Sequence, residues 1–263
     1  MTSIVSTHSY RGGTGKSNIT ANTAALLATR GNRVGIIDTD IQSPGIHALF
    51  HIDPKALKLT LNDYLWGRCA VEDCAVDVSG AIVDQDGGSR LGPGGAVFLV
   101  PSSIRTGEIA RILKEGYDVN ALNDGVRELC ERLQLDFLLI DTHPGVNEET
   151  LLSIAISDSL LLIMRPDVQD YQGTAVTLEL ARRLEVPQLL IIVNKALPAF
   201  DFRDLSQRIF ETYKSPVGAI LPLSEDMVRL GSNGLISMLD PDHPISQSLD
   251  QVAGMLGPDQ SQS

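Results

Sequence analysis

The stretch that decides the fold spans residues 3–29 and reads SIVSTHSYRGGTGKSNITANTAALLAT. It opens with a short β-branched run, Ile4–His8, and closes with a helix-length run, Lys16–Thr29. Between them, the segment Arg11-Gly12-Gly13-Thr14-Gly15-Lys16-Ser17 is rich in glycine, which lets backbone N–H groups turn inward without Cβ clashes. A strand, a glycine-rich turn and a helix in this order predict a loop that holds phosphate groups at a helix N-terminus.

The side chains of this segment have separate expected roles. The Lys16 ammonium can reach the β- and γ-phosphates of a nucleotide such as ATP, and the Ser17 hydroxyl can bind Mg²⁺. The residues expected to line the phosphates are Gly12, Gly13, Thr14, Gly15, Lys16, Ser17 and Asn18. The generic loop pattern has a glycine where this chain has Tyr10, so the alternative is a glycine-rich turn before an unrelated helix. The strand, the helix and the G-K-S core together favour the phosphate loop.

Short aliphatic runs recur along the chain without alternating with polar residues. Runs such as FLLI, LLLIM and LLIIV are typical of strands covered on both faces, as in a parallel sheet flanked by helices. The predicted strands are Ile4–His8, Arg33–Ile37, Ala96–Val100, Asp136–Ile140, Leu160–Met164, Leu189–Val193 and Val217–Ile220. The predicted helices are Lys16–Thr29, Val119–Arg132, Glu148–Ala155, Gly173–Leu184 and Phe202–Tyr213. This alternation predicts an α/β fold with a doubly wound, mostly parallel sheet, whose ligands bind beyond the carboxyl ends of the strands.

Two acidic motifs follow predicted strands. Asp38-Thr39-Asp40 comes directly after RVGII, and Asp141 follows DFLLI. Mg²⁺ prefers hard oxygen ligands, and four apolar residues before an aspartate match the Walker B arrangement. We therefore expect a Mg²⁺ site made from Ser17, Asp38, Asp40 and Asp141. The alternative for Asp38-Thr39-Asp40 is a polar turn cap without chemistry.

Taken in their order, these motifs resemble those of the MinD/ParA family of phosphate-loop ATPases. The family's deviant Walker A loop has a basic residue before a GG-x-GK-[ST] core, and this chain has Arg11 at that place. In the family this residue is normally a lysine that contacts the nucleotide of the partner subunit. The resemblance implies catalytic roles for Lys16, for Arg11 across a dimer interface, and for Asp40 in orienting the attacking water.

The resemblance covers further segments of the chain. Gly145, in the segment Asp141-Thr142-His143-Pro144-Gly145, resembles the glycine whose amide senses the γ-phosphate. We expect His143 to be a local spacer in this segment and not a catalytic base. The residues that match the family's adenine site are Asn194 and Lys195, after the strand LLIIV, together with Leu221 and Pro222.

Composition narrows the class of protein. The 263 residues, 43% of them hydrophobic, suffice for one substantial core, and no low-complexity linker divides them, so we expect a single domain over residues 1–263. The three cysteines form no C-x-x-C pair, which fits reduced thiols in the cytoplasm and argues against the family's iron–sulfur branch. The net charge of −12 opposes constitutive binding to DNA or anionic lipid.

Within the family, the resemblance implies a homodimer that sandwiches ATP, hydrolyses it, and responds to a protein activator or cargo adaptor. Spatial positioning and partitioning regulators work in this way. Two alternatives stay open: a nucleotide-dependent adaptor or sensor with little turnover, and an amidating or carboxylating synthetase of the same fold.

Two sets of residues bear on binding to a membrane or to DNA. Ile245, Leu249, Val252 and Leu256 form an apolar stripe, but no Lys or Arg occurs from residue 230 to residue 263. Anionic headgroups repel an acidic helix, so we expect it to pack on its own domain and not to bind membranes. Nucleoid DNA binding stays open, although the net charge does not favour it. The candidate basic residues are Arg182, Arg183, Arg203, Arg208 and Lys214.

Overall fold

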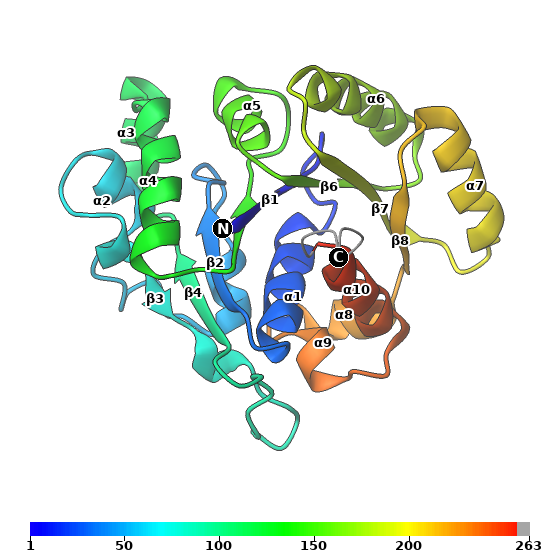
Figure 1. The fold of residues 1–263 in the computed structure, drawn as a ribbon, viewed down its shortest axis with the longest axis horizontal. Coiled ribbons are helices and arrows are strands. Elements are labelled where there is room, and N and C mark those ends of the chain that lie inside the picture. The colour runs from blue at the N-terminus through cyan, green and yellow to red at the C-terminus, as the bar shows by residue number, and fades with distance from the viewer. Residues whose placement is uncertain (257–263) are drawn as a thin grey trace.

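The computed structural model describes residues 1–256, in which eight strands form one sheet (Figure 1). Their order is β3-β4-β2-β5-β1-β6-β7-β8. The strands are β1 (Ser3–His8), β2 (Arg33–Asp38), β3 (Val76–Asp77), β4 (Ala96–Val100), β5 (Phe137–Asp141), β6 (Ser159–Met164), β7 (Gln188–Ala196) and β8 (Val217–Pro222). Neighbouring strands pair in parallel, except that the short edge strand β3 is antiparallel to β4. The predicted mostly parallel sheet is confirmed.

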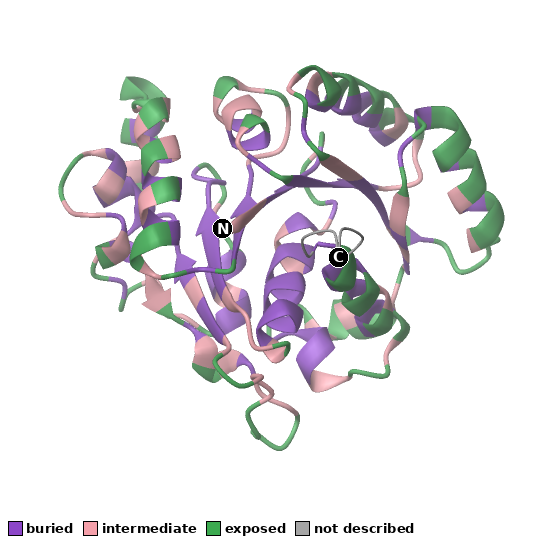
Figure 2. Ribbon diagram, viewed as in Figure 1, coloured by how far each residue is buried: buried purple, intermediate pink, exposed green. Residues whose placement is uncertain are grey.

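The middle of the sheet is buried on both faces (Figure 2). Every residue of β5 and of β6 is buried, which is why their sequences are uninterrupted apolar runs. The two-residue strand β3 gives no such signal and was not predicted. The sequence had indicated that Asn194 and Lys195 lie beyond the end of β7. This strand instead continues to Ala196, so both residues lie inside it.

Helices cover both faces of the sheet (Figure 1). One face carries α1 (Lys16–Thr29), α8 (Glu225–Leu230), α9 (Ile236–Leu239) and α10 (Pro244–Met255). The other carries α4 (Val119–Arg132), α5 (Glu148–Ala155), α6 (Val168–Arg183) and α7 (Phe202–Tyr213). The helices α2 (Leu61–Leu65) and α3 (Thr106–Glu115) pack beside α4, and short 3₁₀ helices occur at Ile46–Phe50, Glu72–Cys74 and Ser79–Ala81.

Helix α6 begins earlier than its apolar pattern predicts. The predicted start was Gly173, but the helix begins at Val168 because the Asp167 carboxylate accepts hydrogen bonds from the backbone N–H groups of Gln169 and Asp170. Such a cap satisfies donors that a helix end otherwise leaves unpaired. Gly173 therefore lies inside the helix, where the Tyr10 ring packs against it.

The apolar stripe of α10 packs on its own domain, as predicted. Its residues share a core with α1 and β8 and are between 0% and 4% exposed: Ile245, Leu249, Val252 and Leu256. This stripe is thus the inner face of a core helix and not a free apolar surface. Within residues 1–256, no helix is long and apolar enough to cross a bilayer.

The strand order brings distant motifs to one edge of the sheet. β5 lies between β2 and β1, and its register places Asp141 beside both Asp38 and Thr7. The phosphate loop follows β1 directly, so it starts next to the last residues of both neighbours. Polar groups from three separate regions of the sequence therefore meet at the carboxyl edge of the central strands.

Candidate functional site

The loop between β1 and α1 adopts a conformation that requires glycine. Gly13 has φ +74° and Gly15 has φ +95°, the left-handed region that side chains disfavour. A Cβ on Gly15 would also collide with the amide nitrogen of Asn194. Gly15 caps the N-terminus of α1. The loop therefore lies at the positive end of the helix dipole, where an anion is stabilised.

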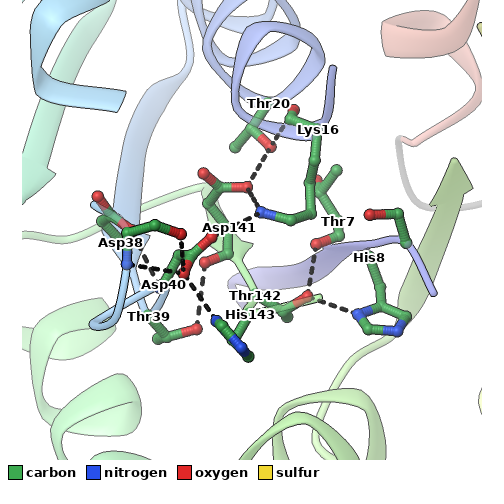
Figure 3. Close-up of polar contacts among 12 residues, drawn as sticks. Thr7, His8, Lys16, Thr20, Asp38, Thr39, Asp40, Asp141, Thr142 and His143 are labelled. Atoms are coloured by element: carbon green, nitrogen blue, oxygen red, sulfur yellow. Dashed lines mark hydrogen bonds and ion pairs between the residues drawn. The ribbon is translucent and has the colours of Figure 1, made fainter. Parts of the chain in front are cut away.

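Lys16 lies at the centre of the site (Figure 3). Its ammonium nitrogen is 2.9 Å from Asp141 Oδ1 and 3.9 Å from Asp40 Oδ2, and its side chain is only 7% exposed. The Thr20 hydroxyl also donates to Asp141 Oδ1, at 3.4 Å. The structure thus brings together the lysine of the loop and the acids that the sequence assigned to catalysis and to Mg²⁺.

Asp38 is the most confined acid of the site. It is fully buried, its Oδ1 accepts the backbone N–H of Asp40 at 3.0 Å, and Oδ2 has no partner within residues 1–256. Burial, followed by the nearby Asp141 carboxylate, raises the pKa of Asp38 well above its ordinary value. A cation bound nearby would stabilise the ionised form of this carboxyl group.

Asp40 has a different environment. Burial alone would raise the pKa of Asp40, but a hydrogen bond from His143 and the Lys16 ammonium together hold it below its ordinary value. Nδ1 of His143 lies 2.7 Å from Asp40 Oδ1. His143 is therefore more than the spacer that the sequence indicated, because its side chain links the loop after β5 to the loop after β2.

The donor set fits a phosphate chain with Mg²⁺. Buried polar atoms without a partner in residues 1–256 gather around the loop: Thr14 Oγ1, Asn18 Oδ1, Asp38 Oδ2 and Asp141 Oδ2. Ser17 is half-buried in the first turn of α1. No three His, Cys, Asp or Glu side chains of the described chain are arranged to hold a metal by themselves. Mg²⁺ usually takes few protein ligands and completes its shell with phosphate oxygens and water, so this donor set suits it.

A pocket of about 200 Å³ opens beside the phosphate loop. It is lined by Gly15, Asn18, Asn194, Lys195, Leu221 and Pro222, and also by Met227, Ile236, Ile245 and Leu249. The first group was predicted to contact a nucleotide. The second group, from α8, α9 and α10, was missed, and its only sequence signal is the apolar spacing within α10. The apolar walls suit a flat base.

Asn194 and Lys195 also fix the loop. The Asn194 amide donates to the Thr14 carbonyl at 2.7 Å, and its oxygen accepts the Lys195 N–H at 2.8 Å. The Lys195 ammonium donates to the Gly13 carbonyl at 2.8 Å. The Asn194 amide keeps one N–H and one lone pair for a base edge.

Gly145 and Arg11 both bind other residues of their own chain. The Gly145 N–H donates to the Ser9 carbonyl at 3.2 Å, so sensing a phosphate would require that bond to break. The Arg11 guanidinium lies 3.4 Å from Asp167 and 3.5 Å from Asp170, at the start of α6. Sequence reasoning did not foresee these carboxylates, because they lie more than 150 positions away.

Comparison with known proteins accounts for this arrangement. Residues 5–237 match the family model described as the CobQ/CobB/MinD/ParA nucleotide binding domain. The chain belongs to this family. Nucleotide binding is the property that the family's description gives for this domain. The match includes the phosphate loop, both acidic motifs and the lining of the adjacent pocket as far as Ile236.

Individual relatives cover nearly the whole chain. An ATP-binding protein of Methanocaldococcus jannaschii is 25% identical, over 94% of this chain and 85% of its own. The flagellum site-determining protein YlxH of Helicobacter pylori is 26% identical, over 97% and 82%. The septum site-determining protein MinD of Pyrococcus horikoshii, solved with Mg-ADP, superposes with a TM-score of 0.78 at 20% identity, covering 99% of this chain and 97% of its own. This last likeness concerns the fold.

Proposed function

We propose that this chain binds ATP with Mg²⁺, hydrolyses it slowly, and dimerises around it as a positioning regulator of the MinD/ParA type. The observation that carries the proposal is the placement of Lys16, 2.9 Å from Asp141 and 3.9 Å from Asp40. A buried ammonium among carboxylates, beside a glycine-rich loop at the N-terminus of α1, can exchange its acidic partners for phosphate oxygens.

Each residue would then have one task. Lys16 and the loop N–H groups bind the β- and γ-phosphates and stabilise the charge that develops there. Asp40 orients a water for attack on the γ-phosphorus. Ser17, Asp38 and Asp141 hold Mg²⁺, directly or through water, and bound Mg²⁺ supplies further charge neutralisation. Arg11 of each subunit would reach the phosphates bound by the other.

The positioning role is supported by the relatives named for flagellum and septum site determination. The α10 stripe is buried. Arg182 donates to the Tyr213 carbonyl and to Ser215, and Arg183 pairs with Glu179. Arg203, Arg208 and Lys214 remain exposed, but the net charge of −12 opposes binding of DNA, so we favour a protein partner.

One observation favours the alternative of an adaptor or sensor with little turnover. Arg11 is held by two carboxylates of its own subunit, and a guanidinium held in this way does not assist hydrolysis elsewhere. The synthetase alternative has less support, because we identify no residues for a second substrate.

Phosphate release tests the proposal, measured with and without candidate partners. Asp40→Ala should keep ATP binding and lose hydrolysis by roughly 100-fold or more, because the attacking water loses its acceptor. Lys16→Ala should lose ATP binding itself, and the exposed Lys55→Ala serves as the matched control. Unchanged ATP affinity in Lys16→Ala would refute the site, whereas ATP-dependent dimerisation of the wild type without phosphate release would favour the adaptor.

A further inference from the structure

Asp40 and His143 meet although they are 103 positions apart in the sequence. Asp40 lies in the loop after β2, and His143 lies in the loop after β5 (Figure 3). An ionised carboxylate has no hydrogen to donate and can only accept hydrogen bonds. His143 Nδ1 therefore carries the hydrogen of this 2.7 Å bond and donates it.

The two oxygens of Asp40 are used unequally. Oδ1 accepts the backbone N–H of Ser43 at 3.3 Å, the Ser43 hydroxyl at 3.0 Å, and His143 Nδ1 at 2.7 Å. Oδ2 instead lies 3.9 Å from the Lys16 ammonium. Oδ1 thus accepts three hydrogen bonds from the protein. Oδ2 lies toward the phosphate-binding lysine and can accept a hydrogen bond from water.

The backbone of His143 is held by a hydrogen bond from α5. Its backbone carbonyl accepts the Thr150 hydroxyl of α5 at 3.2 Å, and its side chain is 20% exposed. The backbone of His143 is thus tied to α5, and its ring contacts a carboxylate at the end of a different strand. A fixed donor of this kind limits rotation of the carboxylate it holds, and such support commonly decides whether a reacting group is in place.

We propose that His143 is a positioning residue for ATP hydrolysis: its bond to Oδ1 holds the Asp40 carboxylate so that Oδ2 points to the attacking water. This inference rests on the proposed ATPase function and deepens it. His143 acts through Asp40 and does not touch the nucleotide. Its removal should therefore lower kcat and leave nucleotide binding unchanged.

Two substitutions separate the hydrogen bond from the volume of the ring. His143→Leu fills similar space without a donor, whereas His143→Asn can place an amide N–H where Nδ1 lies. We expect His143→Leu to lower kcat roughly 10- to 100-fold, with the KM for ATP and the affinity for a non-hydrolysable ATP analogue within about twofold of wild type. His143→Asn should recover most of this loss. Ser43→Ala, which removes a longer bond to the same oxygen, should cost less than His143→Leu.

The outcomes divide cleanly. An unchanged kcat in His143→Leu overturns the inference, as does a His143→Asn variant that is as slow as His143→Leu. Weaker binding of the analogue in step with kcat shows a purely structural role and also overturns it. A wild type that releases no phosphate, alone or with partners, refutes the proposed function and this inference with it, which distinguishes that failure from the others.

Discussion

The ring of Tyr10 lies against the α-carbon of Gly173, in the space that any side chain at position 173 would occupy. Tyr10 stands where the generic phosphate-loop pattern has a glycine, and Gly173 lies inside α6. The large side chain at position 10 fills the space that the missing side chain at position 173 leaves. The residue that enters the phosphate loop is thereby packed against α6.

Gly173→Ala should therefore destabilise the protein, by about 1–3 kcal/mol if the overpacked ring must shift. The matched control is Gly107→Ala in α3, where a Cβ would meet nothing within 4 Å, and which should stabilise by about 0.4–1 kcal/mol. Chemical denaturation of both variants measures the difference. Equal stability in the two variants would show that the Tyr10 ring yields without cost.

The raised pKa of Asp38 predicts that the stability of the folded protein depends on pH. Its folded pKa is raised by burial and by Asp141, so between the unfolded pKa and the folded pKa the native protein holds a proton that the unfolded chain has released. Stability therefore falls as pH rises through this window. Asp38→Asn removes that loss, and it should raise the melting temperature of the nucleotide-free protein at pH 7 but not below about pH 4.

The same substitution should weaken Mg²⁺-dependent ATP binding, because a ligand oxygen loses its charge. Melting curves across pH, with the exposed Asp86→Asn as control, test the first effect, and calorimetry with and without Mg²⁺ tests the second. A pH-independent change in melting temperature would contradict the assignment of the shift to Asp38.

Arg11 should act across the dimer once it leaves Asp167 and Asp170. Arg11→Ala should lose ATP-dependent dimerisation and hydrolysis together, while ATP affinity of the monomer falls only slightly, because Lys16 supplies the loop's own cation. Arg11→Lys should keep part of both functions. Mixing Arg11→Ala with Lys16→Ala subunits should restore partial hydrolysis, since one site then has its own Lys16 and the Arg11 of its partner. A cross-linked but inactive mixed dimer would count against the trans role.

The α10 helix should not attach this protein to membranes. Its apolar stripe is buried, and no Lys or Arg occurs from residue 230 to residue 263, so binding to anionic lipid would bring neither apolar burial nor strong electrostatic attraction. We expect no sedimentation with anionic vesicles, with or without ATP. Deletion of α10 would expose the core, so Gln247→Glu with Gln251→Glu on its exposed face is the better probe. ATP-dependent sedimentation that this double variant weakens would contradict the prediction.

Local sequence was sufficient for all strands of the sheet except β3 and for the placement of two acidic side chains at its carboxyl edge. Strands such as β5 and β6 were predictable because burial on both faces leaves an unbroken apolar run, and Asp38 and Asp141 were predictable because they end such runs. The contacts of His143 with Asp40 and of Arg11 with Asp167 were not predictable, since they join residues that are 103 and 156 positions apart. The early start of α6 was missed because its capping aspartate precedes the apolar pattern.

The pocket beside the phosphate loop is built from both ends of the described chain. Asn22 of α1 accepts hydrogen bonds from Ser237, 215 positions later, and the pocket wall beyond Ser237 comes from Ile245 and Leu249. Translation delivers the phosphate loop before it delivers this wall. A nascent chain therefore emerges from the ribosome with a phosphate loop that has no closed pocket for a base. Under the proposed function, tight capture of nucleotide requires α10 to be in place and therefore follows its synthesis.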